Sequence, residues 1–275
     1  MLIRVISAVV ALGILFPVLV FSHTWALPFA AALVGCICLF EMFGCLKVRK
    51  NLWLSIPFYL VAIAAPFGMR YMSDQKLFLA CLCSCAALLA MISLGVSVFS
   101  HRKIPTSQTA SAYMTGMYII ASFVAIIYVR DSSEHGLFLL IMMFAAPWIS
   151  DTFAYLIGRK FGKHKLIPDV SPKKSVEGAI AGVVGCTAVL LIYGLVCSKV
   201  WSVHCNYVVL GVLGVLLSIV GQIGDLAMSV IKREYDIKDY GKIMPGHGGA
   251  LDRFDSVLAV SIVLAVAEIF VNIFE

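Results

Sequence analysis

The sequence predicts an all-α, polytopic transmembrane helical bundle of about nine spans. Of its 275 residues, 61% are hydrophobic and only 13% are charged, and the mean hydropathy is +0.99. A soluble globular domain is only about 45 to 50% apolar. The apolar residues form runs of about 20, the length that crosses a bilayer core roughly 30 Å thick. Because lipid cannot satisfy exposed backbone N–H and C=O groups, such runs must be helices.

Nine apolar segments are predicted as spans. They lie at residues 2–21, 25–46, 52–69, 77–99, 111–129, 137–157, 178–197, 206–228 and 255–274. The first is kept as a span and not as a signal peptide, because no clear small-residue cleavage site follows it. Charged residues, glycines and prolines accumulate at membrane depth only in the second half. Residues 1–145 are therefore expected to be N-terminal scaffold helices, and residues 146–275 a C-terminal catalytic region.

The cations between the segments predict the orientation of the chain. Of the 21 lysines and arginines, all but five lie in the loops after the second, fourth, sixth and eighth segments. The exceptions are Arg4 and, on the opposite side, Arg70, Lys76, Arg130 and Lys199. The positive-inside rule places the cation-rich loops in the cytoplasm. The formal net charge of +6 therefore indicates topology and anionic ligands, and no nucleic-acid partner is expected.

The first polar cluster is DTFAYLIGRKFGKHKLIPDVSPKKSVEG, from Asp151 to Gly178. Lys173, Lys174 and Ser175 lie just before an expected helix start, where backbone N–H groups and the helix dipole attract anions. The compact SPKKS turn therefore predicts phosphate binding. The other lysines of this loop fit equally well a loop that only fixes topology.

The second cluster is GQIGDLAMSVIKR, which ends at Arg233. If the eighth helix continues through it, Asp225, Ser229 and Lys232 lie at i, i+4 and i+7 and share one face. A carboxylate inside a membrane helix costs at least about 2.5 kcal/mol, so it normally faces a partner, a cavity or a metal. A structural ion pair between Asp225 and a nearby lysine is the alternative.

The third cluster is KDYGKIMPGHGGALDRFDS, which ends at Ser256. Gly248 and Gly249 let backbone N–H groups approach an anion, so the segment is typical of a phosphate-cradling loop. Asp252 and Asp255 lie three residues apart at the start of the ninth segment. Two carboxylates that close repel each other, and a divalent cation is the usual compensation. His247 could be a base or a ligand, but a single histidine beside glycines is more often a structural hydrogen-bonding residue.

Together the three clusters favour Mg²⁺ and a polyphosphate. Asp225, Asp252 and Asp255 supply the hard oxygen ligands that Mg²⁺ prefers. The cations expected on the same cytoplasmic side are Lys173, Lys174, Lys232 and Arg233. Glu41 and Glu268 are lone acids in other segments and receive no role.

The run SVIKREYDIKDYGKIMPGHGGALDRFDS, from Ser229 to Ser256, resembles the signature of the phosphatidate cytidylyltransferases, also called CDP-diacylglycerol synthases. The segments DTFAYLIGRKFGKHKL and SPKKSVEG resemble the same family. Met244 stands where the pattern favours Leu, Ile or Phe, and Ser175 where Thr is expected, and both keep the chemical character. The specific resemblance covers residues 148–258.

The resemblance implies transfer of the cytidylyl group of CTP to phosphatidate, dependence on Mg²⁺ with a second cation such as K⁺, and a homodimer whose interface the N-terminal helices could supply. It places Asp225, Asp252 and Asp255 at the metals and Lys232 beside the nucleotide's phosphates. The expected phosphate-binding residues are Lys173, Lys174, Ser175, Ser229, Arg233, Gly248, Gly249 and Arg253. The expected location is a bacterial inner (cell) membrane, with the active site facing the cytoplasm.

Three other functions are weighed against this one. A secondary transporter would also place acids at membrane depth, but it leaves the glycine loop and the clustered lysines without a purpose. A CTP-dependent polyprenol or dolichol kinase has similar needs and is the closer alternative. A CDP-alcohol phosphotransferase is disfavoured because its DGxxAR helix motif is missing.

Overall fold

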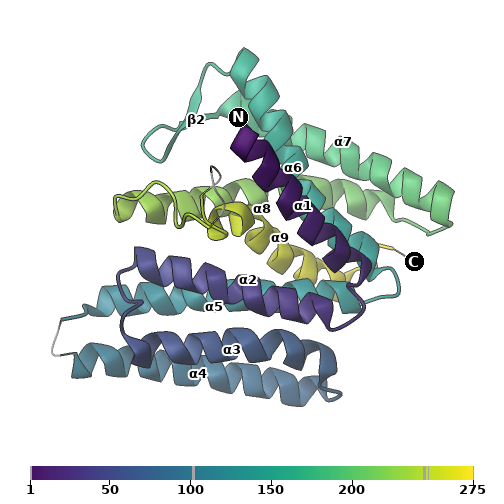
Figure 1. Ribbon diagram of the computed structural model, residues 1–275. Coiled ribbons are helices and arrows are strands. Elements are labelled where there is room, and N and C mark those ends of the chain that lie inside the picture. Colours follow the sequence, from purple (N-terminus) through teal and green to yellow (C-terminus); the bar gives the residue numbers. More distant parts are fainter. Residues whose placement is uncertain (1, 101–102, 244–245, 247, 275) are drawn as a thin grey trace. The chain divides into compact units, whose positions relative to one another are not determined.

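The computed structural model describes residues 2–100, 103–243, 246 and 248–274, with side chains from residue 9 onward (Figure 1). Within these residues the chain forms nine helices and two short strands. The elements are α1 Leu2–Val20, α2 Ala26–Cys45, α3 Leu52–Tyr71, α4 Gln75–Phe99, α5 Thr106–Asp131, α6 Gly136–Phe161, β1 Lys165–Ile167, β2 Ser171–Ser175, α7 Val176–Trp201, α8 Tyr207–Glu234 and α9 Leu251–Phe270. Each predicted apolar segment corresponds to one helix, so the all-α prediction is confirmed. Met244, Pro245 and His247 lie outside the described residues.

The prediction of nine spans is wrong, because seven of the described helices are long and apolar enough to cross a membrane. These are α2 to α8. In α1, side chains are described only from residue 9 onward, and the apolar stretch Val9–Val20 is not counted among the seven. The 20-residue α9 contains Asp252, Arg253, Asp255 and Glu268, and so many charged groups oppose insertion into hydrocarbon. The chain is an integral membrane protein whose helices expose large apolar side chains along their length.

The chain divides into two compact units. The first contains Met1–Asp131 and Glu234–Arg253, and the second contains Ser132–Arg233 and Phe254–Glu275. Each unit is therefore built from two separate stretches of sequence. The division into a scaffold at 1–145 and a catalytic region at 146–275 concerns function and stays a prediction.

In the first unit, α2, α3, α4 and α5 pack side by side. Phe43 of α2 meets Phe58 of α3 edge to face, with ring centroids 5.4 Å apart. A Cβ added at Gly116 of α5 would lie 2.6 Å from the Phe58 ring, so this crossing requires glycine. Arg70 and Asp131 join the ends of α3 and α5 through an ion pair of 2.7 Å. Aromatic packing and a glycine contact thus hold these helices together.

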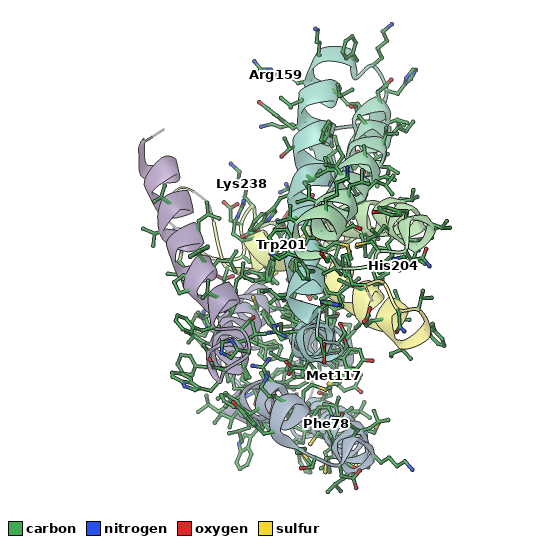
Figure 2. The ribbon with its side chains drawn as sticks, turned by 90° about the vertical axis from the view of Figure 1, so that its right-hand side faces the viewer. Phe78, Met117, Arg159, Trp201, His204 and Lys238 are labelled. Carbon is green, nitrogen blue, oxygen red and sulfur yellow. The ribbon has the colours of Figure 1, made fainter. Side chains whose placement is uncertain are left out.

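In the second unit, α6 and α7 form an antiparallel pair joined by the β1–β2 hairpin. In the hairpin, Lys165 is paired with Ser175. Away from the hairpin, the rings of Phe138 and Trp201 lie 5.5 Å apart between centroids. Figure 2 shows Arg159 at the hairpin end of α6 and Trp201 well away from it. The polar end of this helix pair is therefore the end that carries the first polar cluster.

Candidate functional site

The hairpin brings a lysine to the acid of α8. Lys174 Nζ lies 2.5 Å from Asp225 Oδ2, and these side chains are only 25% and 26% exposed. One turn further along α8, the Ser229 hydroxyl lies 3.5 Å from Asp225 Oδ1. Lys232 lies next on the same stripe and is 8% exposed. Because α8 continues to Glu234, the predicted helical face is formed, and it faces a basic hairpin.

Glycines fix the start of α7 against α6. The Ser175 hydroxyl caps α7 by accepting a hydrogen bond from the Gly178 N–H at 3.2 Å. A Cβ at Gly158 of α6 would lie 2.9 Å from this hydroxyl, and a Cβ at Gly162 would lie 2.5 Å from it. The glycines of the GRKFG sequence therefore make room for the capping residue. Ser175 is buried, so its main observed role is to terminate the hairpin and begin α7.

The remaining cations of this region are exposed. Lys173 precedes Lys174 in β2 and is exposed to solvent. Arg233, at the end of α8, is also exposed, and its Nε donates to the carbonyl oxygen of Val170 at 3.3 Å. That contact ties the turn of the hairpin to α8. The hairpin is thus held at two points, by Lys174 and by Val170.

Asp255 lies on α9 where that helix meets α8. A Cβ at Gly224 would lie 2.7 Å from the Ala259 Cβ and 2.9 Å from the Asp255 carbonyl oxygen. The two helices therefore touch at the residue that precedes Asp225. Asp255 is 7% exposed, and its Oδ1 accepts a hydrogen bond from the Ser256 N–H at 2.8 Å. The second unit thus has an acid on each of two helices in contact.

In the first unit, Asp252 holds the glycine loop. Its Oδ2 accepts hydrogen bonds from the Tyr240 N–H at 2.8 Å and the Gly249 N–H at 2.9 Å. Gly248 has a φ of +90°, and a Cβ there would lie 3.0 Å from the same oxygen. One oxygen of this carboxylate therefore organises the loop that precedes α9. The neighbouring Arg253 is exposed.

Glu41, a lone acid with no role predicted from the sequence, also lies in this region. It lies in α2, is 3% exposed, and accepts hydrogen bonds from the backbone of Ala250 and Leu251 at 3.1 and 2.9 Å. Its partners lie more than 200 residues away in the sequence, so no local pattern reveals them. The one available signal was its place in an apolar segment, since an acid there normally has a partner.

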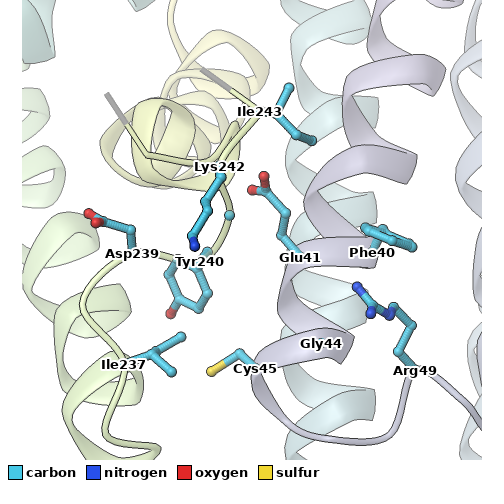
Figure 3. Close-up of a pocket in the computed structure, with 11 residues that line it drawn as sticks. Phe40, Glu41, Gly44, Cys45, Arg49, Ile237, Asp239, Tyr240, Lys242 and Ile243 are labelled. Atoms are coloured by element: carbon cyan, nitrogen blue, oxygen red, sulfur yellow. The ribbon is translucent and has the colours of Figure 1, made fainter. Parts of the chain in front are cut away.

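A pocket of about 350 Å³ lies in the first unit beside Glu41 (Figure 3). Its lining residues are Phe40, Glu41, Gly44, Cys45, Arg49, Ile237, Asp239, Tyr240, Gly241, Lys242 and Ile243. The Arg49 guanidinium lies over the Phe40 ring, 4.2 Å from its centroid, a cation–π contact. Nearby, burial raises the pKa of the Tyr235 hydroxyl, with further contributions from Glu234 and Cys45. The pocket thus combines cationic and aromatic groups with a polar wall from the loop between α8 and α9, called the signature loop below.

The acids have the donor chemistry that a hard cation needs. Neither unit, within its described residues, brings together three or more His, Cys, Asp or Glu side chains at metal-binding distances. Mg²⁺ does not require such a cage, because it commonly binds through one or two carboxylates, waters and substrate phosphates. The carboxylates of Asp225 and Asp255 fit that requirement.

The comparisons with known proteins cover nearly the whole chain. The model of the cytidylyltransferase family matches residues 2–273. A Staphylococcus epidermidis protein named phosphatidate cytidylyltransferase is 33% identical over 260 residues, which is 94% of this chain and 96% of that protein. A Bacillus subtilis protein of the same name is 32% identical over 239 residues, which is 85% of this chain and 86% of that protein. A Staphylococcus aureus protein of this name is 31% identical over 262 residues.

Proposed function

Since the chain belongs to the cytidylyltransferase family, we propose that it transfers the cytidylyl group of CTP to phosphatidate, forming CDP-diacylglycerol and pyrophosphate. Relatives of nearly the same length carry the name of that activity. The structural observation that carries the proposal is the pair of Lys174 and Asp225, with 2.5 Å between Nζ and Oδ2. It joins a cation and a hard oxygen donor, which a reaction between two polyanions requires.

The proposed reaction is a displacement at phosphorus. A phosphate oxygen of phosphatidate forms a bond to the α-phosphorus of CTP, while the bond from that phosphorus to the bridging oxygen of the β-phosphate breaks. A phosphate monoester has a second pKa of about 6, so this nucleophile is largely dianionic at neutral pH. A dedicated general base is therefore unnecessary. The protein has to neutralise charge and to align the two substrates.

We propose that three cations serve the first of these tasks. Lys174 is held by the hairpin and by Asp225, while Lys232 and Arg233 lie at the end of α8. In our proposal they bind the triphosphate of CTP, together with Lys173 and the hydroxyl of Ser229. Gly248, Gly249 and Arg253 are proposed to contact phosphate from the signature loop and the first turn of α9.

The proposed cofactor is Mg²⁺, with a second cation such as K⁺. Asp225 and Asp255 are the proposed ligands in the second unit, and Asp252, three residues before Asp255 in α9, is proposed as the third. When bound, a divalent cation would offset the negative charge that develops on the phosphates. Asp225 would then have two roles, since it also holds Lys174 in place.

The cationic loops are proposed to face the cytoplasm of a bacterial inner (cell) membrane. If α2 to α8 span the membrane, the loops after α2, α4, α6 and α8 lie on one side. These loops hold most of the lysines and arginines, which favours the cytoplasmic side. A homodimer, as the resemblance implies, completes the proposal.

The test is turnover of radiolabelled CTP by the purified, detergent-solubilised protein, with phosphatidate or dolichol as acceptor and with Mg²⁺ or EDTA. We expect magnesium-dependent label in CDP-diacylglycerol. Because a kinase transfers the γ-phosphate, the dolichol arm uses CTP labelled at that phosphorus. Label in dolichyl phosphate, without product from phosphatidate, would replace the proposal by a lipid kinase. Turnover of neither acceptor would reject both enzymatic functions and favour transport.

A further inference from the structure

The first residue of α9 has its backbone partner on another helix. Leu251 begins α9, and the residue before it is Ala250, which has no side-chain oxygen to accept the free N–H groups of a helix start. Glu41 of α2 supplies both missing acceptors. Its Oε1 accepts from the Ala250 N–H at 3.1 Å and its Oε2 from the Leu251 N–H at 2.9 Å. A carboxylate 3% exposed thus caps a helix from a distance, where the helix dipole also favours a negative charge.

The same carboxylate occupies the space beside two glycines of the signature loop. A Cβ added at Gly241 or at Gly249 would overlap the Glu41 carboxylate in each case. Figure 3 shows the Glu41 side chain directed from α2 toward the loop that contains Tyr240 and Lys242. Neither glycine has a positive φ, so backbone strain does not explain them. Close approach to Glu41 does.

Asp252, the second carboxylate of this region, accepts hydrogen bonds from the neighbouring backbone N–H groups. Asp252 holds the N–H groups of Tyr240 and Gly249, and Glu41 holds the next two N–H groups after Gly249. Four backbone N–H groups are therefore fixed by two acids. As a result, the two ends of the signature loop are fixed relative to the first turn of α9.

We propose that Glu41 is a positioning residue for the cytidylyl transfer. It fixes the start of α9 and packs against the loop before it at Gly241 and Gly249, and so sets where Asp252 stands during the reaction. This inference rests on the proposed function, because the loop's work is defined by it. Glu41 itself need not touch either substrate.

The experiment compares Glu41→Ala and Glu41→Gln with the wild-type protein, using Glu268→Gln as the matched control. Glu268 is another incompletely exposed acid, near the opposite end of α9. We expect kcat to fall about 100-fold in Glu41→Ala, the scale of loss seen when reacting groups shift by about 1 Å. The KM for CTP should rise by only about threefold, because the loop's phosphate contacts shift while the proposed contacts of Lys174, Lys232 and Arg233 stay in place. Glu41→Gln, which keeps one acceptor oxygen, should recover part of kcat, and Glu268→Gln should retain the wild-type value.

Hydrogen exchange separates positioning from general loss of structure. In Glu41→Ala, peptides covering the start of α9 should exchange about tenfold faster, because two amides lose their acceptors, while peptides of α3 to α8 remain unchanged. Faster exchange throughout the protein, together with a lower melting temperature, would show that kcat falls because the whole fold is destabilised. That outcome would overturn the positioning role.

A double-mutant cycle with Gly241 tests the contact directly. Gly241→Ala should lower kcat strongly in the wild-type background, because the added methyl meets the Glu41 carboxylate, but should add little in the Glu41→Ala background. Additive effects would contradict the inference. If the Glu41→Ala protein does not accumulate, Gly241→Ala and Glu41→Gln test the positioning role instead. An unchanged kcat in both variants would overturn that role. Absence of turnover by the wild-type protein would instead reject the proposed function.

Discussion

Lys174 and Asp225 lie 2.5 Å apart, between Nζ and Oδ2, and join the β2 strand of the hairpin to the middle of α8. The pair accounts for an acid inside a long apolar helix, since its charge is offset by a cation delivered from the polar end of the helix bundle. The pair could serve the reaction or only the stability of the fold, and substitutions at these two residues distinguish the two roles.

Asp225→Asn is expected to lower kcat about 1,000-fold, because it removes a proposed metal ligand and releases Lys174. Lys174→Ala should instead act largely on the KM for CTP, raising it about tenfold, the scale of one lost charge-assisted contact. Steady-state kinetics with phosphatidate measure both. Lys199→Ala, in the last turn of α7, is the control and should behave as the wild type.

The combined variant Lys174→Met with Asp225→Leu separates the two explanations. A pair that serves only stability can often be replaced by apolar residues of similar size without loss of the fold. The double variant is therefore expected to fold. Because the proposed function gives both residues a part in the reaction, it is also expected to be inactive. Retained turnover in it would assign the pair to structure alone.

Gly158→Ala is expected to lower thermal stability. Alanine is the better helix former by about 1 kcal/mol in an exposed helix interior, but here the added methyl would lie 2.9 Å from the Ser175 hydroxyl. The crowding should displace the hairpin and cost a net 1 to 3 kcal/mol, roughly the scale of overpacking. Gly95→Ala in α4 is the matched control, because nothing lies within 4 Å of its added Cβ. Thermal unfolding in detergent should show a loss in the first variant only, and equal melting temperatures would contradict the packing argument.

The helices could be predicted from the sequence because apolar runs of about 20 residues leave the backbone no alternative in lipid. The last predicted segment was wrongly counted as a span, because hydrophobicity alone was a poor guide there. The last segment begins within the signature, and Asp252, Arg253 and Asp255 make α9 too polar to count as a span. The stripe of Asp225, Ser229 and Lys232 followed from helical spacing, which is a local property.

Contacts between distant segments could not be predicted. The β1–β2 hairpin contains Pro172, Lys173 and Lys174 and lacks the apolar alternation by which a strand is recognised, so the sequence predicts a loop there. The partners of Glu41 depend on how α2 packs against the loop before α9. A single sequence contains no direct record of that packing.

Gly224→Ala is expected to lower kcat about 100-fold, since it pushes α8 and α9 apart beside Asp225 and Asp255. The added methyl would lie 2.7 Å from the Ala259 Cβ. Ala259→Gly removes that atom and should restore part of kcat in the double variant. Turnover and melting temperature should be measured for both single variants and the double variant. No recovery in the double variant would show that helix separation is not the cause.

Removal of divalent metal is expected to abolish turnover, and added Mg²⁺ should restore it. Asp255→Asn should raise the Mg²⁺ concentration needed for half-maximal turnover by about tenfold or more, because one carboxylate ligand becomes a weaker amide donor. The measurement is a Mg²⁺ titration of the EDTA-treated protein, with Asp74→Asn as the control for charge removal. Asp74 caps α4 at the start of that helix. An unchanged titration for Asp255→Asn would remove this residue from the proposed ligand set.

The orientation with α2 to α8 as spans predicts which loops a membrane-impermeant thiol reagent can reach. Asp169→Cys, in the hairpin turn, should be protected in intact cells and labelled after the membrane is opened, because the cationic loops are expected in the cytoplasm. His204→Cys, between α7 and α8, should be labelled in intact cells. Both positions are exposed, and the native cysteines are first replaced by serine or alanine in a background that retains turnover. Labelling of both sites from the same side would contradict α7 as a span. If Asp169→Cys is labelled in intact cells and His204→Cys is protected, the cationic loops and the proposed site lie outside the cytoplasm.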